Sequence, residues 1–381
     1  MADLHIGIDA SRTAVAARTG TEQYTVELLG ALARLDHRTR YTLYCNNLPT
    51  ALPPLGANFA LRRIPMRRLW THARLSTELA LHPPDVLFVP AHVIPLGAPL
   101  ARRTRTVVTI HDLGYLHFPE AHTQTQRLYL RLSTAWSARV ASDVIAISAA
   151  TRDDLVRYAR VPREKIHVIH HGVATRFRPA DALAVAAMQA RHGIDAPYFL
   201  FIGTVQPRKN LERVIEAFAK VAQIGDCTAI TNLQLVIAGK KGWQTAPIER
   251  RAAQLGVADR VRFVGYLPDD DLPPLLGGAL GFVFPSLYEG FGMPVLEAMA
   301  CGTPVITSTT SSLPEVAGEA ALLVDPHDTG AIARAMERLA CEPELRATLA
   351  ERGQEQAARF TWDACAAATL QVLRKKRGLG R

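Results

Sequence analysis

Two carboxylates flank a glycine turn in the segment from Glu289 to Glu297, which reads Glu-Gly-Phe-Gly-Met-Pro-Val-Leu-Glu. Pro294 suits the first position of a helix, so the spacing predicts a short helix over about residues 294–301. The two glycines let main-chain N–H groups approach an oxyanion closely, and the dipole of the predicted helix favours negative charge at its start. The segment therefore predicts a binding site for a diphosphate.

The two acidic residues have a functional and a structural interpretation. We place Glu297 in the first turn of the predicted helix and Glu289 before the glycine turn, so that the carboxylates face a ligand from different directions. One could contact a sugar and the other a ribose. In isolation, two acids with this spacing are better explained as residues that complement the helix dipole. The surrounding pattern favours the functional interpretation.

A strand, a Glu, a Gly-x-Gly turn, a helix started by Pro and a second Glu, in this order, resemble the signature of glycosyltransferase family 4, the group 1 transferases. The resemblance covers nearly the whole chain and is strongest over residues 198–326. It implies the GT-B fold, in which two doubly wound α/β domains of Rossmann type face a deep cleft. It also implies a C-terminal helix, at about residues 361–381, that crosses back to the N-terminal domain.

The segment from Gly203 to Asn210 resembles the family's strand, loop and helix that hold the diphosphate of the donor. Arg208 offers a planar fork and Lys209 a compact charge to phosphate oxygens. Two solvated cations on a loop are the alternative. Asn210 is expected to cap the following helix. Thr204 stands where many members have Arg, and this form resembles bacterial mannosyltransferases of O-antigen and exopolysaccharide assembly.

Three further segments, around Gly20, His111 and Gly265, resemble the family and occur in the family's order along the chain. Gly265 and Tyr266 are similar to the segment beside the nucleobase, with a buried turn as the alternative. Gly20 lies in the first βα loop, where relatives carry a second glycine and this chain has Glu22. His111 follows a predicted parallel strand and resembles the family's histidine at the lip of the cleft, although a histidine at a strand end is often structural.

The resemblance implies catalytic roles for Glu289, His111, Arg208 and Lys209. It implies donor binding by Gly20, Gly203, Arg208, Lys209, Gly265, Tyr266, Gly290, Phe291, Gly292, Met293, Pro294 and Glu297. Two neighbouring residues have structural interpretations. We expect Asp112 to orient His111 or to cap a helix, and Ser148 to cap the helix that follows it.

Two other patterns could be mistaken for metal sites. The sequence from Asp269 to Asp271 has an acidic spacing used by metal-dependent transferases of another fold, but it follows a proline and opens a predicted helix, so we interpret it as capping. His170 and His171 are adjacent and would point apart on a strand. We therefore predict no metal, and no cofactor other than the nucleotide sugar that serves as co-substrate.

Short apolar runs alternate with helical patterns along the chain, and this alternation predicts parallel sheets with helices on both faces. The predicted strands of the first half cover residues 4–8, 85–89, 107–110, 144–147 and 166–169. Those of the second half cover residues 198–202, 233–238, 261–264, 281–284, 304–307 and 321–324. We place the domain boundary at about residue 180, which gives an acceptor-binding domain of residues 1–180 and a donor-binding domain of residues 181–360.

Composition and charge are those of a globular protein of two domains. The chain has 381 residues, 48% of them hydrophobic and 21% charged, and no low-complexity segment. The net charge of +9 divides unevenly. Residues 1–180 carry 23 basic and 13 acidic residues, a balance of +10, whereas residues 181–381 carry 21 and 22, a balance of −1. The basic half could contact anionic lipid, an anionic acceptor or nucleic acid.

The stretch from Arg62 to Arg74 interleaves five arginines, the two end residues included, with several apolar residues. It could lie on an anionic membrane, or it could be a solvated basic surface. Because relatives with lipid-linked acceptors have basic N-terminal surfaces, we favour a peripheral membrane contact. We find no secretion signal or bilayer-spanning stretch, and the five widely spaced cysteines indicate neither disulfides nor zinc, so we expect a cytoplasmic protein.

The resemblance to family 4 implies a retaining hexosyltransferase in cell-surface polysaccharide biosynthesis. The expected donor is GDP-mannose, with a UDP-sugar second, and the expected acceptor is a saccharide or a polyprenyl-linked saccharide. Nucleotide-sugar epimerisation or hydrolysis on the same fold is an alternative. A non-catalytic basic module that binds membrane or nucleic acid is another, although we expect no nucleic acid as partner.

Overall fold

The computed structural model describes residues 4–14, 20–49, 52–91, 93–101, 103–121, 123–223, 232–243 and 245–375. The chain forms two compact units. One consists of Met1–Gly172 with Phe360–Arg381, and the other of Val173–Arg359. The division after Gly172 precedes the boundary that we expected at about residue 180, because the segment that leads into the second sheet already packs with the second unit.

The first unit contains a sheet in which all strand pairs are parallel. Its strands are β1 (His5–Asp9), β2 (Arg40–Cys45), β3 (Phe59–Arg63), β4 (Val86–Val89), β5 (Arg105–Ile110), β6 (Asp143–Ala146) and β7 (Ile166–Val168). Their order in the sheet is β3-β2-β1-β4-β5-β6-β7. Strands β2 and β3 are absent from the sequence prediction. β3 is the edge strand and carries two arginines, so it lacks the apolar run by which the others were found.

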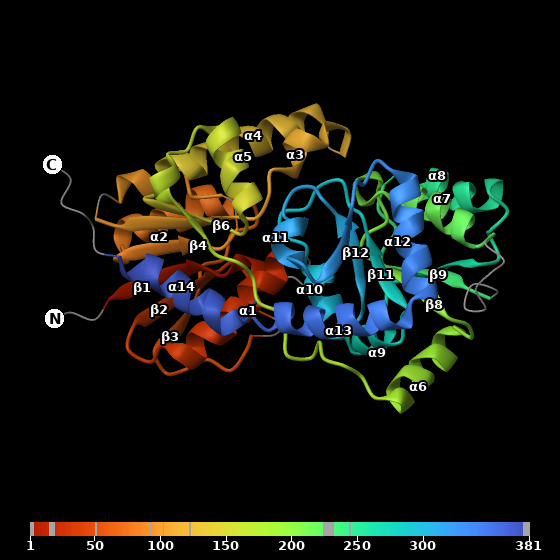
Figure 1. Cartoon of the computed structure of the whole chain (residues 1–381). Coiled ribbons are helices and arrows are strands. Elements are labelled where there is room, and N and C mark those ends of the chain that lie inside the picture. The colour runs from red at the N-terminus through yellow and green to blue at the C-terminus, as the bar shows by residue number, and fades with distance from the viewer. Residues whose placement is uncertain are drawn as a thin grey trace. The chain divides into compact units, whose positions relative to one another are not determined.

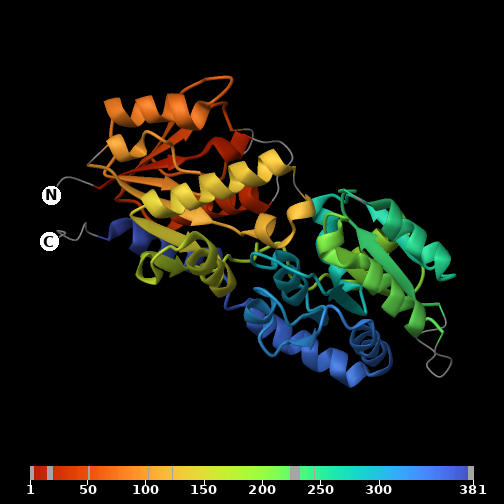
Figure 2. The same ribbon diagram turned by 90° about the horizontal axis from the view of Figure 1, so that it is seen from above.

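Helices cover both faces of this sheet (Figures 1 and 2). They are α1 (Gly20–Leu35), α2 (Ser76–Leu81), α3 (Gly114–His117), α4 (Gln124–Val140), α5 (Ala149–Ala159) and α14 (Trp362–Arg374). Helix α14, from the C-terminal end of the chain, packs beside α1 (Figure 1). Trp362 and Leu373 share one hydrophobic core with Tyr24 and Leu28 of α1. The last helix therefore completes the core of the first unit.

The second unit contains a sheet in which all strand pairs are again parallel. Its strands are β8 (Tyr198–Ile202), β9 (Gln234–Ala238), β10 (Val261–Gly265), β11 (Gly281–Phe284), β12 (Val305–Ser308) and β13 (Ala321–Val324). Their order is β10-β9-β8-β11-β12-β13. Each was predicted to within a residue or so, because a strand buried on both faces is a short apolar run.

The helices of the second unit are α6 (Ala182–His192), α7 (Leu211–Val221), α8 (Thr245–Gln254), α9 (Leu272–Gly277), α10 (Met293–Ala300), α11 (Leu313–Ala317), α12 (Thr329–Cys341) and α13 (Pro343–Ala357). The predicted apolar stripe of α7 is buried, with Leu211, Val214, Ile215 and Phe218 in the core. No helix in the described ranges is long and apolar enough to cross a membrane.

Both sheets are doubly wound, as predicted, and each has a point where the strand order reverses. In the first unit that point lies between β1 and β4, and in the second between β8 and β11. Loops that leave such neighbouring strands at their carboxyl ends diverge to opposite faces of the sheet, which opens a crevice where ligands of this architecture bind. The two points therefore direct the search for functional sites.

The capping interpretation of the acidic run before α9 is wrong. Asp269–Asp271 forms a 3-10 turn, and Asp271 precedes α9 without a capping hydrogen bond from its side chain. Its buried carboxylate instead pairs with Arg191 and lies 2.9 Å from Nε2 of His192, at the end of α6. Asp271 therefore anchors the start of α9 to the end of α6.

The basic stretch from Arg62 to Arg74 is only partly a free surface. Nη2 of Arg62 lies 2.6 Å from a carboxylate oxygen of Glu78, and Nη1 of Arg74 lies 3.6 Å from the other. Glu78 is buried, so these two arginines neutralise an internal charge. Arg63 is exposed, and so is the loop at residues 65–69, which contains Arg67 and Arg68.

Candidate functional site

A buried ion pair joins the two loops at the reversal point of the second sheet. Lys209 lies in the loop after β8 and Glu289 in the loop after β11. The ammonium of Lys209 donates a hydrogen bond of 2.6 Å to Oε1 of Glu289, and Nη1 of Arg208 lies 3.0 Å from Oε2. Lys209 also lies over the ring of Phe284, 4.7 Å from its centroid. The structure thus brings together three residues that the sequence predicted separately.

The electrostatics of this cluster keep Glu289 ionised. Burial by itself would raise the pKa of the carboxyl, but the charges of Lys209 and Arg208 and hydrogen bonds from Lys209 and Ser286 outweigh it. They lower the pKa of Glu289 to about 2. At neutral pH the site therefore contains one carboxylate held between two cations.

Main-chain contacts fix the two loops against each other. The carbonyl of Arg208 accepts hydrogen bonds from the N–H of Leu287 (3.0 Å) and the hydroxyl of Ser286 (3.1 Å). The guanidinium of Arg208 in turn donates to the carbonyl of Tyr288. The cations at 208 and 209 are therefore held in place by the loop that contains Glu289.

Two serines after β12 hold the glycine turn from the other side. The N–H of Glu289 donates to Oγ of Ser311 at 2.9 Å. The hydroxyl of Ser312 lies within hydrogen-bonding distance of the carbonyls of Glu289 (2.9 Å) and Phe291 (2.7 Å). Sequence analysis assigned no role to either serine, although both lie in a segment similar to the family's.

Asn210 does not cap helix α7 as expected. It has a left-handed backbone with φ 62°, and its side chain makes no capping bond. Its amide nitrogen instead donates to the carbonyls of Pro285 (3.0 Å) and Pro326 (2.7 Å). Asn210 thus connects the loops after β8, β11 and β13, which explains why an amide rather than a simple cap occupies this position.

The glycine turn leads into helix α10, close to the predicted bounds. Gly292 precedes the helix with φ 110°, a conformation that favours glycine. A Cβ on Gly292 would lie 2.7 Å from Cδ2 of Leu313. Gly292 has no side chain that could cap this helix end, Pro294 has no N–H, and the N–H of Val295 donates to the carbonyl of Gly292 at 3.0 Å. The helix start therefore offers a ligand chiefly the positive end of its dipole. Such a helix start suits an anion.

Glu297 lies just beyond the first turn of α10, one position deeper than predicted. The helix begins at Met293 and has no acidic residue in its first turn, so Glu297 does not complement the helix dipole. Its side chain is half-buried, and desolvation raises the pKa of the carboxyl to about 8, against the opposing charge of Arg176. At neutral pH the group is therefore mostly protonated and can donate a hydrogen bond as well as accept one.

Glycines mark the carboxyl ends of three neighbouring strands of the second sheet. Gly203 follows β8 and Gly239 follows β9. A Cβ added to Gly239 would lie only 2.1 Å from the carbonyl oxygen of Gly203, so this close approach requires glycine. The N–H of Gly239 donates to the carbonyl of Gly265 at 2.7 Å. Gly265 and Tyr266 are exposed, with Nζ of Lys240 4.7 Å from the centroid of the tyrosine ring. The alternative of a buried turn at Gly265 is therefore wrong, and the segment presents an aromatic face to solvent.

His111 lies in the first unit, in a buried aromatic cluster. Its ring packs edge-on against Tyr24 with centroids 4.9 Å apart, and its Nε2 donates to the carbonyl of Pro90 at 2.7 Å. His171 is stacked on Tyr24 and Trp362, whereas His170 faces Phe360. The two adjacent histidines thus have different partners. Donation to a carbonyl places a proton on Nε2 of His111.

Three other residues singled out in the sequence, Ser148, Asp112 and Gly20, lie at the starts of helices in the first unit. The hydroxyl of Ser148 accepts from the N–H of Thr151 at 3.1 Å and caps α5, as predicted. Oδ1 of Asp112 accepts from the N–H of Gly114 at 2.8 Å, at the start of α3. Gly20 is the first residue of α1, and a Cβ there would meet no atom within 4 Å.

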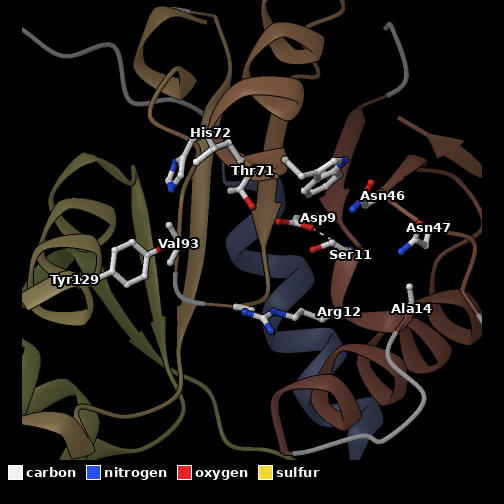
Figure 3. A pocket seen from close by; sticks show the side chains of 13 residues that line it. Asp9, Ser11, Arg12, Ala14, Asn46, Asn47, Thr71, His72, Val93 and Tyr129 are labelled. Atoms are coloured by element: carbon white, nitrogen blue, oxygen red, sulfur yellow. Dashed lines mark hydrogen bonds between the residues drawn. The ribbon is translucent and has the colours of Figure 1, made fainter. Parts of the chain in front are cut away.

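The reversal point of the first sheet contains a pocket that sequence analysis missed (Figure 3). It has a volume of about 470 Å³ and lies at the carboxyl ends of β1, β2 and β4. Its polar lining includes Asp9, Ser11, Asn46, Asn47, Thr71 and His72. One signal could have indicated it, since Asp9 ends the first strand, but a single acid at a strand end is weak evidence.

Candidate metal ligands do not cluster in the described ranges of the chain. These residues contain no group of three or more His, Cys, Asp and Glu side chains that could hold an ion. The site around Glu289 instead combines two cations and a helix start with two carboxyl groups. At neutral pH that of Glu289 is ionised and that of Glu297 is mostly protonated. This arrangement can bind a diphosphate through charge and sugar hydroxyls through the carboxyl groups.

Comparisons with known proteins agree with this chemistry. Residues 187–356 match the sequence model of the family described as glycosyl transferases group 1, and residues 18–177 match that of glycosyltransferase family 4. The O-antigen chain mannosyltransferase B of Escherichia coli is 32% identical over 272 residues, which are 71% of this chain and 70% of that protein.

Two solved structures have a similar fold. Sucrose-phosphate synthase from Thermosynechococcus elongatus has a TM-score of 0.77 at 24% identity, over 97% of this chain and 98% of that one. HepE of Anabaena, in complex with UDP and glucose, has a TM-score of 0.75 at 18% identity, over 98% and 99%. These likenesses show the fold, GT-B. The family matches and the relative show that the chain belongs to glycosyltransferase family 4, the group 1 glycosyltransferases, and is a hexosyltransferase.

Proposed function

We propose that this enzyme transfers a hexose, with mannose favoured, from a nucleoside-diphosphate sugar to a hydroxyl of a saccharide or lipid-linked saccharide, with retention of configuration. GDP-mannose is the first candidate donor and a UDP-sugar the second. Similarity to an O-antigen mannosyltransferase supports mannose, and the complex of HepE with UDP supports a nucleotide donor. The proposed setting is cell-surface polysaccharide biosynthesis in the cytoplasm.

The observation that carries this proposal is the cluster of Lys209, Arg208 and Glu289 beside the start of α10. On binding of a donor, the two cations would exchange part of their contact with Glu289 for phosphate oxygens. The main chain of the glycine turn near Gly292, at the positive end of the α10 dipole, would contact the same diphosphate. Glu289, released from part of its pairing, could then accept a hydrogen bond from a hydroxyl of the transferred sugar.

Catalysis would consist of stabilising the leaving group. As the bond between the anomeric carbon and the phosphate oxygen breaks, negative charge grows on the diphosphate, where Arg208 and Lys209 are already in place. The acceptor oxygen forms its bond to the anomeric carbon on the face that the diphosphate leaves. The acceptor proton passes to an oxygen of the departing diphosphate. No metal is required in this scheme, because the protein supplies the positive charge.

His111 would have a positioning role in the same reaction. Its ring is fixed by Pro90 and Tyr24, so its orientation does not depend on the ligand. We propose that the imidazole or the neighbouring main chain contacts the transferred sugar. Gly20 at the start of α1, and Gly203, Gly265 and Tyr266 at the strand ends of the second unit, are proposed contacts of the donor.

The test begins with thermal unfolding of the purified protein in EDTA with GDP, UDP, ADP or dTDP. A ligand that binds only the folded state raises the free energy of unfolding, by about 2.7 kcal/mol at a concentration one hundred times its dissociation constant. The midpoint temperature of unfolding rises accordingly. We expect GDP to stabilise most. Sugar transfer is then measured with the corresponding donor and a set of saccharide acceptors.

The outcomes separate the alternatives. If none of the four nucleotides raises the midpoint, the proposal is wrong. If the donor is converted equally fast with and without acceptor, the enzyme is an epimerase or hydrolase instead. For variants of Lys209, Lys241→Met is a matched control, because Lys241 forms an ion pair with Glu249 at 2.6 Å on the surface of the same unit. It should behave as the unmodified protein.

We also propose a peripheral contact with anionic membrane through the loop at residues 65–69. Arg67 and Arg68 are exposed there, beside Leu69, whose side chain is 72% exposed. On the same unit, helix α4 exposes Leu128, Leu132 and Trp136 at a spacing of four residues, which forms one stripe. Basic and apolar side chains together suit a surface of anionic headgroups.

A further inference from the structure

The loop that follows β12 runs beside the glycine turn and contacts its main chain through hydroxyl groups. The hydroxyl of Ser308 donates to the carbonyl of Ser286 at 2.7 Å, at the start of the loop after β11. Ser311 and Ser312, which we call the serine pair, contact the turn itself. All these residues belong to the second unit. The conformation of the glycine turn therefore depends on side chains that come from a different strand end.

Ser312 determines the direction of two peptide groups of the turn. Its buried hydroxyl lies 2.9 Å from the carbonyl oxygen of Glu289 and 2.7 Å from that of Phe291. The peptide bonds of the turn are trans, and in a trans peptide group the C=O and the following N–H point in opposite directions. The N–H groups of Gly290 and Gly292 therefore both point away from Ser312 and from the interior in which its side chain is buried. Main-chain N–H groups directed to one side of a turn can bind an anion.

Ser311 holds the peptide group that precedes Glu289. The N–H of Glu289 donates to Oγ of Ser311 at 2.9 Å. The carbonyl of the same peptide group belongs to Tyr288 and accepts from the guanidinium of Arg208. Both peptide groups that flank the Cα of Glu289 are thus held by the serine pair, which fixes the direction in which its side chain leaves the main chain. That side chain is the carboxylate paired with Lys209.

The backbone of Ser311 is strained. Its φ is 54°, in the left-handed region that glycine adopts readily and other residues adopt rarely. A glycine would remove the strain, but it could not accept the N–H of Glu289. Strained residues of this kind persist where the surrounding structure uses their geometry, and they cluster at functional sites. The conformation of Ser311 therefore points to a role in positioning Glu289 as well as in folding.

We infer that Ser311 and Ser312 are positioning residues for the proposed transfer reaction, and that each acts on a different part of the donor. Ser312 directs the N–H groups of Gly290 and Gly292 toward the diphosphate. Ser311 directs the carboxylate of Glu289 toward the transferred sugar. Because the turn follows Glu289 directly, its N–H groups reach the phosphate that is joined to the sugar. The inference rests on the proposed function and deepens it, since it assigns separate determinants to the diphosphate and the sugar.

The first experiment measures selectivity for the second phosphate. Calorimetric titrations in EDTA compare GDP with GMP and UDP with UMP, for the unmodified protein and for Ser312→Ala. With the base that binds, we expect Ser312→Ala to weaken the diphosphate on the order of tenfold and to leave the monophosphate unchanged, because the two glycine N–H groups lose their orientation. Partial unfolding would instead lower the number of sites for both nucleotides and leave the ratio of their affinities unchanged.

The second experiment separates the sugar from the diphosphate. Ser311→Gly removes the hydroxyl and the strain, and it adds freedom to the unfolded chain, so stability should change little. The probes are GDP-mannose and UDP-glucose, each compared with its diphosphate. We expect unchanged affinity for the diphosphate, whereas affinity for the nucleotide sugar and kcat should each fall on the order of tenfold. A purely structural role for Ser311 would leave both quantities unchanged in this variant.

Matched variants control for the loss of a buried hydrogen bond. Thr303→Val removes a buried hydroxyl that donates to the carbonyl of Leu276 at 2.8 Å, just before β12. It should lower stability as Ser312→Ala does, because each change removes a donor from a buried carbonyl, but it should keep the affinity ratio of the unmodified protein. If Ser312→Ala does not fold, Ser312→Cys is measured instead, because a thiol occupies the same position and is only a weak donor. The same loss of selectivity is expected.

The outcomes distinguish this inference from the proposed function. If the unmodified protein binds none of the nucleotides, the proposed function fails, and the inference with it. If the protein binds a diphosphate but the variant of Ser312 keeps the ratio of diphosphate to monophosphate affinity, the role assigned to Ser312 is wrong. If Ser311→Gly keeps its affinity for the nucleotide sugar and its kcat, the role assigned to Ser311 is wrong.

Discussion

The ammonium of Lys209 and the carboxylate of Glu289 form a buried hydrogen-bonded ion pair with an Nζ–Oε1 distance of 2.6 Å, between residues 80 positions apart in the sequence. The pair spans the point where the strand order of the second sheet reverses. It therefore couples the loop that carries the cations to the loop that leads into α10. We therefore expect both the stability of the unit and the proposed binding of the donor to depend on it.

Removing one partner of this pair should cost more stability than removing both. Lys209→Met leaves the Glu289 carboxylate buried with one partner fewer, and such changes cost about 3–5 kcal/mol. The double variant Lys209→Met with Glu289→Gln removes the charge pair and should regain much of that loss. Urea unfolding measures both. Equal stability of the single variant and the unmodified protein would contradict the burial of the pair.

Activity should separate from stability in the same variants. The double variant should remain folded but lose the rise in midpoint with nucleoside diphosphates, because the cation and the carboxylate at the site are both gone. Glu289→Ala and Lys209→Ala should likewise abolish sugar transfer. Near-normal turnover in purified samples of these variants would show that the cluster is structural only.

The ion pair should make the second unit sensitive to acid. The pKa of Glu289 is lowered from 4.5 to about 2 in the folded state, so the folded protein binds this proton less readily than the unfolded chain. Its contribution is fully present above pH 4.5 and is lost as the pH falls toward 2. The size is about 3 kcal/mol. Urea midpoints between pH 6 and 3, compared with the double variant, measure the difference, which should shrink with acid.

Glu297 should have the opposite pH dependence. Its pKa is raised from 4.5 to about 8 on folding, so the folded state holds this proton more tightly than the unfolded chain. Stability attributable to Glu297 should therefore fall as the pH rises from 4.5 to 8. Glu297→Gln cannot ionise and should be more stable than the unmodified protein at pH 8, with the difference absent at pH 4.5. A constant difference across this range would show that the carboxyl is not desolvated.

Gly292→Ala should disturb the start of α10. A Cβ at this position would lie 2.7 Å from Leu313, and φ 110° is unfavourable for alanine. We expect a loss of about 1–3 kcal/mol and a weaker response to nucleoside diphosphates. Gly20→Ala is the matched control for stability, because a Cβ there meets no atom within 4 Å. It should change the free energy of unfolding by less than about 0.5 kcal/mol.

Membrane contact should depend on the exposed arginines of the loop at residues 65–69. Co-sedimentation with vesicles that contain phosphatidylglycerol should exceed that with phosphatidylcholine alone, and Arg67→Glu with Arg68→Glu should remove the excess. Arg352→Glu with Arg359→Glu makes the same change of charge at two exposed positions of the second unit, one in α13 and one just after it. If both double variants lose binding equally, the attraction reflects net charge rather than this loop.

Sequence patterns were sufficient where the structure depends on local chemistry. Buried parallel strands are short apolar runs, so all six strands of the second unit were found, and the glycine turn at Gly292 was placed correctly before its helix. The edge strand β3 was missed because an edge needs no continuous apolar run, and its arginines resemble a loop. The cap expected at Asn210 was wrong because its amide is used by the carbonyls of Pro285 and Pro326, which lie far away in the sequence.

The sequence alone determined which residues could bind a diphosphate, since cations, glycines and a helix start are recognisable by type and order. Only the tertiary structure decided how they are used. It pairs Lys209 with Glu289, gives Glu297 an opposite protonation state, and assembles a pocket around Asp9 from the segments that follow β1, β2, β3 and β4. The physical reason is that pairing, desolvation and cavity formation depend on which strand ends become neighbours, and parallel sheets bring together residues that no local pattern connects.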